Sequence, residues 1–379
     1  MAIHKRLKLG MVGGGQGAFI GAVHRIAARI DDEFELVAGA LSSKPEVAQQ
    51  SAAQLGIAPD RAYTDFNEMA KAEAARADGI DAVSIVTPNH MHFPVAKAFL
   101  EQGIHVICDK PLTANLDEAK QLAEIGKTSK AEFVLTHNYS GYPMVREARH
   151  LVQSGALGKL RRVNVEYAQD WLSEAITDPE NKQASWRADP KQAGKGGAIA
   201  DIGTHAMQLA NFITLQAPET LSADLTSFVE GRLVDDDAHM MLRYASGTKG
   251  YLLATQVAPG NENNLRIQIY GDKAGLTWAQ ENPNQLWFAP LNAPKQLLTR
   301  GGHGTSVQTQ GQTRVPPGHP EGYLEGFATI YRDAADLIRN GRGENCLLPT
   351  LEDGLRGMQF IDAAIQSSAQ DAVWTRIGD

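Results

Sequence analysis

The chain has 379 residues, ordinary apolar content and 36 basic against 44 acidic side chains, a net charge of −8. This length favours two domains, and the mixed charges argue against a nucleic-acid surface or an anionic membrane partner. No stretch approaches the roughly 20 apolar residues that span a bilayer, and the N-terminal segment lacks the apolar core of a secretory signal. The two cysteines, Cys108 and Cys346, have no metal-like spacing. A reducing, cytoplasmic compartment fits them best.

A glycine-rich turn follows the first predicted strand. Leu7 to Val12 is a short apolar run, and Gly13-Gly14-Gly15-Gln16-Gly17-Ala18 comes directly after it. Apolar residues at helical spacing then predict a helix, namely Phe19, Ile20, Val23, Ile26, Ala27 and Ile30. Gly13, Gly15 and Ala18 match G-x-G-x-x-A, which lets a pyrophosphate approach the helix N-terminus. In this context the turn predicts a dinucleotide site to which Gln16 also contributes.

The second predicted strand, Phe34 to Leu41, ends in Ser42-Ser43-Lys44. NAD-specific sites usually place an acidic residue here for the ribose hydroxyls. Two hydroxyls and a lysine could instead receive a 2′-phosphate, so both NAD and NADP stay open. The alternative is that Lys44 simply points to water.

Two further apolar runs end in polar residues. Ala82 to Val86 ends at Thr87-Pro88-Asn89, and Ile104 to Cys108 ends at Asp109-Lys110-Pro111. A helical segment separates the runs, so both read as buried parallel strands whose carboxyl ends share one crevice. We expect Thr87, Asn89 and Asp109 to lie near a bound cofactor and Lys110 to be catalytic. The alternative for Lys110 is a surface lysine at a strand-to-loop junction.

Strands and helices alternate as far as Phe133 to His137, which predicts a doubly wound parallel sheet over residues 1–138. Residues 139–379 then form a second domain with a different pattern. Its consecutive strands with turn signals between them predict a large open antiparallel sheet. A long loop, Gly301 to Pro320, is rich in Gly, Gln, His and Pro, and such loops are often functional. Thr350-x-x-Asp353 predicts a capping box at the start of the last helix.

A second candidate cluster lies in Gly196-Gly197-Ala198-Ile199-Ala200-Asp201-Ile202-Gly203-Thr204-His205. Asp201 and His205 are four residues apart, so on a helix they share a face. Histidine suits proton transfer near neutral pH, and a neighbouring carboxylate can orient the imidazole. The alternative is an ordinary pair on a helix surface. A metal site is not expected, because two ligands fall short of the three that catalytic zinc takes.

Four motifs together resemble the Gfo/Idh/MocA family, the group of glucose–fructose oxidoreductase and inositol dehydrogenase. They are GGGQGAFIG, TPNHMH, DKP and GGAIADIGTH, and they occur in the expected order across both halves. IYGDKAGL and GHPEGYLEGF extend the similarity almost end to end, and WRADP suggests the branch that oxidises inositol, levoglucosan and other pyranoses. The family's usual Glu-Lys-Pro is Asp109-Lys110-Pro111 here, a change that could alter the orientation of the lysine.

The resemblance implies a Rossmann domain followed by an α+β domain that often assembles into dimers or tetramers through its antiparallel sheet. Carried over by position, Lys110, Asp201 and His205 are the catalytic set, and Asn89 and His92 lie near the nicotinamide. Ring alcohols suit aromatic faces and multiple hydrogen-bond donors, so the candidate substrate contacts are Tyr142, Arg146, Trp171, Trp186, Arg187 and His319. The alternatives are core packing for the two tryptophans and a solvated helix face for Arg146.

The resemblance therefore implies an NAD(P)-dependent dehydrogenase that oxidises a secondary alcohol of a cyclitol or pyranose. Two alternatives stay open: a non-redox relative that uses tightly bound NAD internally, such as a glycoside-cleaving enzyme, and a ligand sensor without chemistry. A reductase of a conjugated ligand, like biliverdin reductase, is a weaker third, because that chemistry does not need an Asp–His pair. The ring, the carbon oxidised and the physiological direction are not predicted.

Overall fold

The computed structural model describes residues 5–175 and 190–378. The chain forms two compact units, of which the first comprises Met1–Gly141 and Tyr323–Leu355, and the second Tyr142–Gly322 and Arg356–Asp379. The first break lies close to the predicted boundary after residue 138. The predicted second domain, 139–379, differs from the second unit because Tyr323–Leu355 packs with the N-terminal sheet. The candidate residues Trp186 and Arg187 lie outside the described residues.

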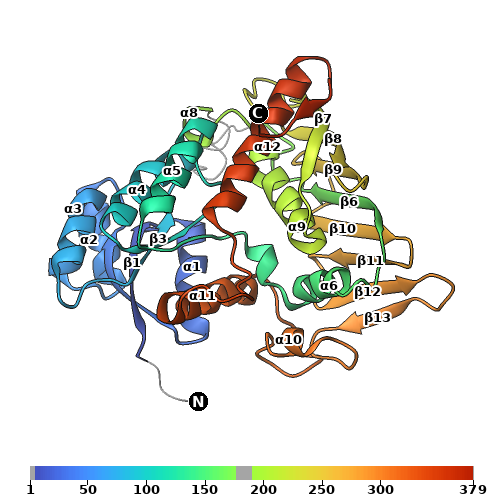
Figure 1. The fold of residues 1–379 in the computed structure, drawn as a ribbon. Coiled ribbons are helices and arrows are strands. Elements are labelled where there is room, and N and C mark those ends of the chain that lie inside the picture. Colours follow the sequence, from blue (N-terminus) through green and yellow to red (C-terminus); the bar gives the residue numbers. More distant parts are fainter. Residues whose placement is uncertain (1–4, 176–189, 379) are drawn as a thin grey trace. The chain divides into compact units, whose positions relative to one another are not determined.

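The first unit contains a five-stranded parallel sheet in the order β2-β1-β3-β4-β5 (Figure 1). The strands are β1 (Leu7–Gly13), β2 (Phe34–Ala40), β3 (Ala82–Val86), β4 (His105–Cys108) and β5 (Phe133–Leu135). The helices between them are α1 (Phe19–Ile30), α2 (Pro45–Gln54), α3 (Phe66–Ala75), α4 (His92–Glu101) and α5 (Leu116–Thr128). The predicted Rossmann fold is confirmed. The strand order reverses between β1 and β3, which is where such sheets bind ligands.

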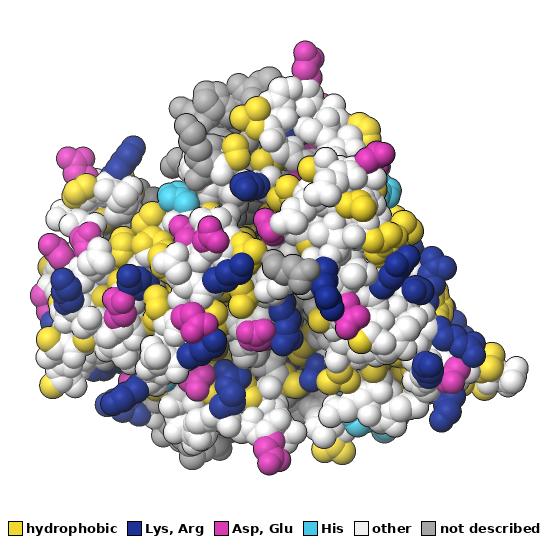
Figure 2. Space-filling view, turned by 45° about the horizontal axis from the view of Figure 1, so that its top comes forward, with side chains coloured by type: hydrophobic (Ala, Val, Ile, Leu, Met, Phe, Trp, Pro, Cys, Tyr) yellow, Lys and Arg dark blue, Asp and Glu magenta, His cyan; other side chains and the backbone are white. Residues whose placement is uncertain are grey.

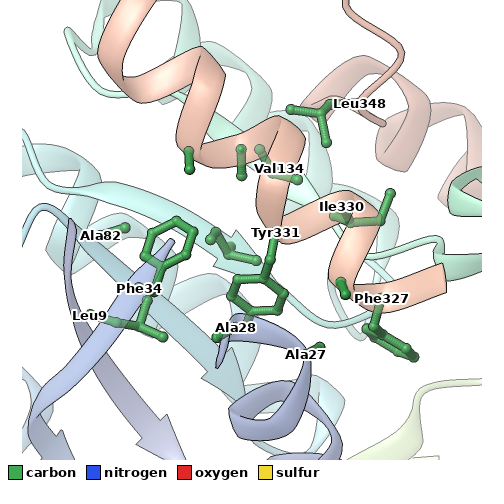
Figure 3. Close-up of a cluster of buried hydrophobic side chains, with 14 of the residues drawn as sticks. Leu9, Ala27, Ala28, Phe34, Ala82, Val134, Phe327, Ile330, Tyr331 and Leu348 are labelled. Carbon is green, nitrogen blue, oxygen red and sulfur yellow. The ribbon is translucent and has the colours of Figure 1, made fainter. Parts of the chain in front are cut away.

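A helix from the C-terminal part of the chain completes this unit. α11 (Tyr323–Asn340) packs against α1, and together they cover one face of the sheet (Figures 1 and 3). Their buried apolar side chains meet those of the strands in one cluster, drawn in Figure 3, which includes Leu9, Phe34, Ala82, Val134 and Tyr331. The parallel strands alone leave this face uncovered beside α1, so α11 supplies the missing apolar surface.

The second unit contains a nine-stranded sheet in the order β13-β12-β11-β10-β6-β9-β8-β7-β14. Its strands are β6 (Leu160–Ala168), β7 (Pro218–Thr226), β8 (Asp237–Tyr244), β9 (Lys249–Thr255), β10 (Asn264–Gly271), β11 (Ala274–Ala279), β12 (Gln285–Pro290), β13 (Gln296–Thr299) and β14 (Thr375–Arg376). Every neighbouring pair is antiparallel except β6 and β9, which run parallel. The predicted large antiparallel sheet is confirmed in the main. The insertion of β6 between β9 and β10 interrupts the predicted meander.

The helices of the second unit include α6 (Pro143–Gln153), α8 (Pro190–Ala193), α9 (Thr204–Thr214) and α10 (Val307–Gln310). α6 packs against α9, which in turn contacts β6 and β9. The boundary between the units falls within α12 (Leu351–Ala369). The predicted capping box opens this helix, since Thr350 N donates to Asp353 Oδ2 at 2.8 Å and Asp353 N donates to Thr350 Oγ1 at 3.3 Å. Within the described ranges, no helix has the length and apolarity to cross a membrane.

Candidate functional site

The glycine-rich turn after β1 is held so closely that side chains would not fit. A Cβ on Gly13 would lie 2.8 Å from the Val86 carbonyl oxygen, and one on Gly15 would lie 2.7 Å from the Leu41 carbonyl oxygen. Gly13 and Gly17 also have positive φ angles of 80° and 75°, which favour glycine. Space around the Cβ position of Gly17 is open. The protein-facing side of the turn therefore has no room for side chains, and the side next to α1 is open. This arrangement fits a dinucleotide pyrophosphate.

Three neighbours that the sequence did not single out fix the turn. Ser51 Oγ of α2 accepts from Gln16 N at 3.1 Å, and the Arg25 guanidinium of α1 donates to the Gly14 carbonyl at 2.6 Å. Gly21 lets α1 approach so closely that a Cβ there would overlap Gly14. Gln16 N therefore has an acceptor inside the protein. Ala18 follows as the residue before α1.

The segment after β2 carries Ser42, Ser43 and Lys44 at the same sheet edge. Lys44 and Ser43 are exposed, and Lys44 N donates to Ser42 Oγ at 3.1 Å. Lys44 is the residue directly before α2, at the helix end where anions are favoured. The nearest carboxylate along the chain, Glu46, already belongs to the first turn of α2.

The turns after β3 and β4 are tied together by His92. One ring nitrogen of this buried histidine lies 2.9 Å from the Thr87 carbonyl oxygen, and the other lies 2.7 Å from the Pro111 carbonyl oxygen. Both ring nitrogens therefore face backbone carbonyls, and the position of His92 near the nicotinamide stays a prediction. Burial lowers the pKa of His92 below its ordinary value, although both carbonyls and Asp109 oppose this. Asn89, in the same turn, is 5% exposed.

Asp109 faces the interior of the first unit. Its Oδ1 accepts from Thr136 Oγ1 at 2.9 Å and lies 3.8 Å from Nε2 of His24. Burial opposes the charged form, but the contact with His24 and the charges of Lys110 and His92 outweigh it and lower the pKa of Asp109. The Asp109 carboxylate is therefore held by protein groups through Oδ1. Its contact with a cofactor stays a prediction.

Lys110 follows at the end of β4, as predicted, and is partly buried. Its peptide bond to Pro111 is cis. The positive charge of Lys110 lowers the pKa of two buried histidines of the same unit, His92 and His137. Lys110 is therefore a partly buried cation at the carboxyl edge of the sheet. The alternative of a fully solvated surface lysine does not describe it.

In the second unit, Asp201 and His205 lie on one continuous helical run. Asp201 belongs to a π-helical segment, Ile199–Gly203, and His205 to the first turn of α9. His205 is 8% exposed, and its ring centroid lies 6.3 Å from that of Tyr167 on β6. Asp201 Oδ2 accepts a hydrogen bond of 2.9 Å from Nε2 of Gln256. This environment is more enclosed than the alternative of a pair on a helix surface.

A chain of glutamines joins Asp201 to Trp171. Gln256 Nε2 also lies 3.3 Å from Gln169 Oε1, which accepts from Trp171 Nε1 at 2.9 Å. The Trp171 ring is 41% exposed, so it is not the core residue of the alternative interpretation. Gln169 and Gln256 carry no motif, and the sequence analysis missed both. The sequence feature that could have identified them is their position directly after strands β6 and β9.

Two of the predicted substrate contacts are buried in the second unit. Tyr142 is 2% exposed and packs edge-on against Trp278, with ring centroids 5.6 Å apart, so its ring belongs to the core. Its role as a substrate contact stays a prediction. Arg146 is also buried, and its Nη1 donates to Gln312 Oε1 at 3.0 Å. The alternative of a solvated helix face for Arg146 is wrong.

The long loop, Gly301 to Pro320, is held by a buried ion pair. Arg300 Nη1 lies 3.0 Å from Glu321 Oε1, and the same guanidinium donates to carbonyls of Val315 and Pro316. Arg300 also donates to the carbonyl of His319, whose side chain is exposed. Contacts from Glu147 to Ser306 attach the loop to α6. The loop is therefore an ordered surface that presents His319 and Gln312.

Candidate residues thus gather in two places, each within one unit. The first unit brings together the glycine turn, Ser42 to Lys44, Thr87 to Asn89 and Lys110 at one sheet edge. The second brings Asp201 and His205 together with Trp171 through Gln256 and Gln169. Among the residues that the structure describes, no group of three His, Cys, Asp or Glu side chains is placed to hold a metal. Basic and acidic side chains are interspersed on the face drawn in Figure 2.

Comparisons with known proteins agree with this arrangement. Residues 7–148 match the oxidoreductase family with an NAD-binding Rossmann fold, and residues 145–277 match the GFO/IDH/MocA C-terminal domain. A crystal structure of an oxidoreductase from Sinorhizobium meliloti has 52% sequence identity and a TM-score of 0.90, covering 98% of this chain and 99% of its own.

The names of two further relatives include a cyclitol or a sugar. The crystal structure of an inositol dehydrogenase homolog from Azotobacter vinelandii, complexed with NADH and myo-inositol, is 32% identical with a TM-score of 0.90. It covers 98% of both chains. Levoglucosan dehydrogenase from Pseudarthrobacter phenanthrenivorans is 28% identical over 97% of both chains. The similarity therefore extends over both units.

Proposed function

The chain belongs to the Gfo/Idh/MocA family of oxidoreductases, and from this premise we propose that it is an NAD(P)-dependent dehydrogenase of a cyclitol or pyranose sugar. It would oxidise a secondary alcohol on the ring to the ketone, reversibly. The observation that carries this proposal is a glycine turn and a partly buried cation, Lys110, at one edge of the parallel sheet, in a chain similar along its length to inositol and levoglucosan dehydrogenases.

We assign the catalytic roles to Lys110, Asp201 and His205. His205 would accept the proton of the substrate hydroxyl as general base, and Asp201 would orient its imidazole. Lys110 would donate a hydrogen bond to the same oxygen and stabilise the developing negative charge. Bound NAD(P) supplies the hydride acceptor, and that chemistry belongs to the cofactor. The proton would go to His205 and the hydride would take two electrons to the acceptor, which would leave the alcohol as a ketone.

The residues for the cofactor are those at the sheet edge of the first unit. Gly13, Gly15, Gln16 and Ala18 would cradle the pyrophosphate, and Ser42, Ser43 and Lys44 would meet the adenosine ribose. A serine pair with an exposed lysine accepts a 2′-phosphate as readily as a hydroxyl, so use of NADP is part of the proposal. Thr87 and Asn89 would lie toward the nicotinamide.

The substrate ring would meet groups of the second unit. Trp171 offers an exposed aromatic face, and its indole N–H is already fixed by Gln169, which holds the ring in one orientation. His319 and Gln312 are presented by an ordered loop, with Arg146 holding the amide of Gln312. Aromatic faces suit the C–H side of a ring alcohol, and the polar groups suit its hydroxyls.

We also propose that the outer face of the nine-stranded sheet joins copies of this chain into a dimer or tetramer. Cross-strand partners Trp287 and Leu297 are 38% and 40% exposed, and Tyr270 and Met241 are 40% and 53% exposed. Large apolar side chains on one sheet face mark an interaction surface. Light scattering on the purified protein measures the copy number, and Trp287→Glu is expected to lower it. A monomeric wild-type protein would contradict this part of the proposal.

The experiment that tests the proposed function is a substrate panel. Purified protein is mixed with myo-inositol, scyllo-inositol, levoglucosan or glucose, each with NAD+ and with NADP+, and absorbance of the reduced nicotinamide is followed. We expect reduction with at least one ring alcohol. Silence across the panel, in protein that demonstrably binds cofactor, would instead favour internal redox chemistry with tightly bound NAD.

A further inference from the structure

The segment that carries Asp201 and His205 is attached to one end of the nine-stranded sheet. Asp237 at the start of β8 pairs with Thr255 at the end of β9, so the residues just outside these strands lie at the same sheet end. Asp235 precedes β8 and Gln256 follows β9. Both reach the Asp201–His205 segment.

Asp235 binds the backbone where this segment begins. Its Oδ1 accepts from Gly197 N at 2.7 Å, its Oδ2 from Ile199 N at 2.8 Å, and its carbonyl oxygen from Ala198 N at 2.9 Å. Three successive N–H groups therefore have one residue as their acceptor. These are N–H groups at the start of a helical run, which otherwise lack partners. Asp235 thus fixes the first turn in position and direction.

The same contact explains why the residue four positions before Asp201 is a glycine, Gly197. A Cβ on Gly197 would overlap the Asp235 carbonyl oxygen. Gly197 is therefore required for the close approach between the segment and the residue that anchors it. Burial raises the pKa of Asp235, the N–H groups of Gly197 and Ile199 lower it, and the adjacent Asp236, whose own partner is Arg232, raises it, which gives a pKa of about 6. The Asp235 carboxyl is thus mostly ionised at neutral pH and can accept both N–H groups.

Gln256 acts on the side chain rather than the backbone. It is 2% exposed, its own N–H donates to the Asp236 carbonyl at 2.8 Å, and its side chain donates to Asp201 Oδ2 at 2.9 Å. Because Gln256 is buried and its backbone is fixed by Asp236, its side-chain amide fixes the rotation of the Asp201 carboxylate to which it donates. Catalytic geometry is sensitive to such support, since a displacement of about 1 Å can lower a rate about a hundredfold.

We propose that Asp235 and Gln256 are positioning residues for the reaction: Asp235 fixes the backbone ahead of Asp201 and His205, and Gln256 fixes the Asp201 carboxylate. This inference rests on the proposed function, because it takes Asp201 and His205 as the catalytic pair. Neither positioning residue is expected to touch substrate or cofactor.

The test uses Gln256→Met and Asp235→Asn in the full chain. Methionine keeps the volume of glutamine without the donor, and asparagine keeps one acceptor of the two. With the ring alcohol that the panel identifies, we expect each variant to lower kcat about tenfold or more, with KM and NADH affinity changed less than about twofold. Asp224→Asn, an exposed carboxylate on β7, is the matched control and keeps its kcat.

A double-mutant cycle separates positioning from a general structural effect. In the Asp201→Asn background, Gln256→Met is expected to change kcat less than about twofold, because its effect passes through Asp201. Losses that multiply, or an unchanged kcat in the single variants, would overturn the inference while the proposed function stands.

A second measurement needs no substrate. Hydrogen exchange of the peptide that contains Gly197 and Ile199 is compared between wild type and Asp235→Asn at neutral pH, with Asp224→Asn as control. We expect faster exchange in Asp235→Asn alone. Unchanged exchange would overturn the role of Asp235, even if the panel found no substrate and the proposed function had failed.

Discussion

Nδ1 of His24 and the hydroxyl of Tyr331 lie 2.8 Å apart, although 307 positions separate them in the sequence. Ser84 joins them, with its Oγ 3.1 Å from the imidazole and 2.9 Å from the phenol. The other ring nitrogen of His24 faces Asp109, which precedes Lys110. This buried polar group therefore connects α1, β3 and α11 to the strand end that carries the candidate lysine.

Replacing Tyr331 by phenylalanine tests this connection. The variant keeps the ring but removes the hydroxyl, which leaves two buried polar groups with one partner fewer. We expect the free energy of unfolding to fall by about 1–2 kcal/mol in denaturant titration. Ser154→Ala, which removes an exposed hydroxyl after α6, is the control and is expected to change it by less than about 0.5 kcal/mol. Equal stability of both variants would mean that the hydroxyl contributes little.

Gly15→Ala tests the glycine turn. The added Cβ would lie 2.7 Å from the Leu41 carbonyl, so the turn must shift. Crowding of this kind typically costs about 1–3 kcal/mol, and we expect weaker NADH binding by about tenfold or more in fluorescence titration. Gly357→Ala in α12, where the Cβ meets open space, is the control and keeps its affinity. Normal NADH binding by Gly15→Ala would remove the turn from the cofactor site.

Lys44→Ala tests which cofactor the ribose pocket prefers. An exposed ion pair with a 2′-phosphate is worth about 0.2–1 kcal/mol, so we expect NADPH affinity to fall by up to about fivefold while NADH affinity is kept. Lower salt should enlarge the difference. Lys71→Ala on α3 is a matched control with an exposed lysine. Equal losses for both cofactors would show that Lys44 does not read the phosphate.

His205→Ala tests the general base. Loss of a positioned base typically lowers a rate by about a hundredfold to ten-thousandfold, and we expect kcat to fall within this range. NADH affinity should change little, because the predicted cofactor residues lie in the other unit. Turnover close to wild type would remove His205 from the mechanism. The ring alcohol for this assay is the one found in the substrate panel.

Local sequence patterns predicted the parts of the fold that local geometry determines. The glycine turn, the strand ends at Thr87 and Asp109, and the capping box at Thr350 each depend on a few neighbouring residues, and each lies where it was expected. The place of α11 beside α1 depends on residues such as Tyr331 that meet their partners only in the folded chain. The position of β6 between β9 and β10 has the same cause.

The candidate site shows the same division. Asp201 and His205 were predicted as a pair because their spacing on a helix is informative. Gln169 and Gln256 were missed because a glutamine is common at strand ends and its role depends on what it faces after folding. For Arg146, the sequence left a solvated position open, because the residue lies on an amphipathic helix. Its burial and its hydrogen bond to Gln312 follow from packing in the folded chain.

The pH dependence of stability provides a prediction at His137, which is 2% exposed. Burial lowers its pKa to about 4, and Lys110 adds to this, while Asp353 and Asp109 oppose it. In the unfolded chain the pKa is about 6.5, so between these values the unfolded state binds a proton that the folded state does not. Stability is therefore lost as the pH falls from about 6.5 to about 4, by about 3 kcal/mol in total.

His137→Gln is expected to remove this part of the slope. The free energy of unfolding is measured in denaturant at several pH values in that range, and the difference between wild type and variant is plotted. Other histidines cancel in this difference, so only the proton at His137 contributes. Gln50→Asn, at an exposed position on α2 without a titratable group, is the control and should leave the slope unchanged. A slope identical in wild type and His137→Gln would mean that the buried imidazole takes up its proton in the folded protein as readily as in the unfolded chain.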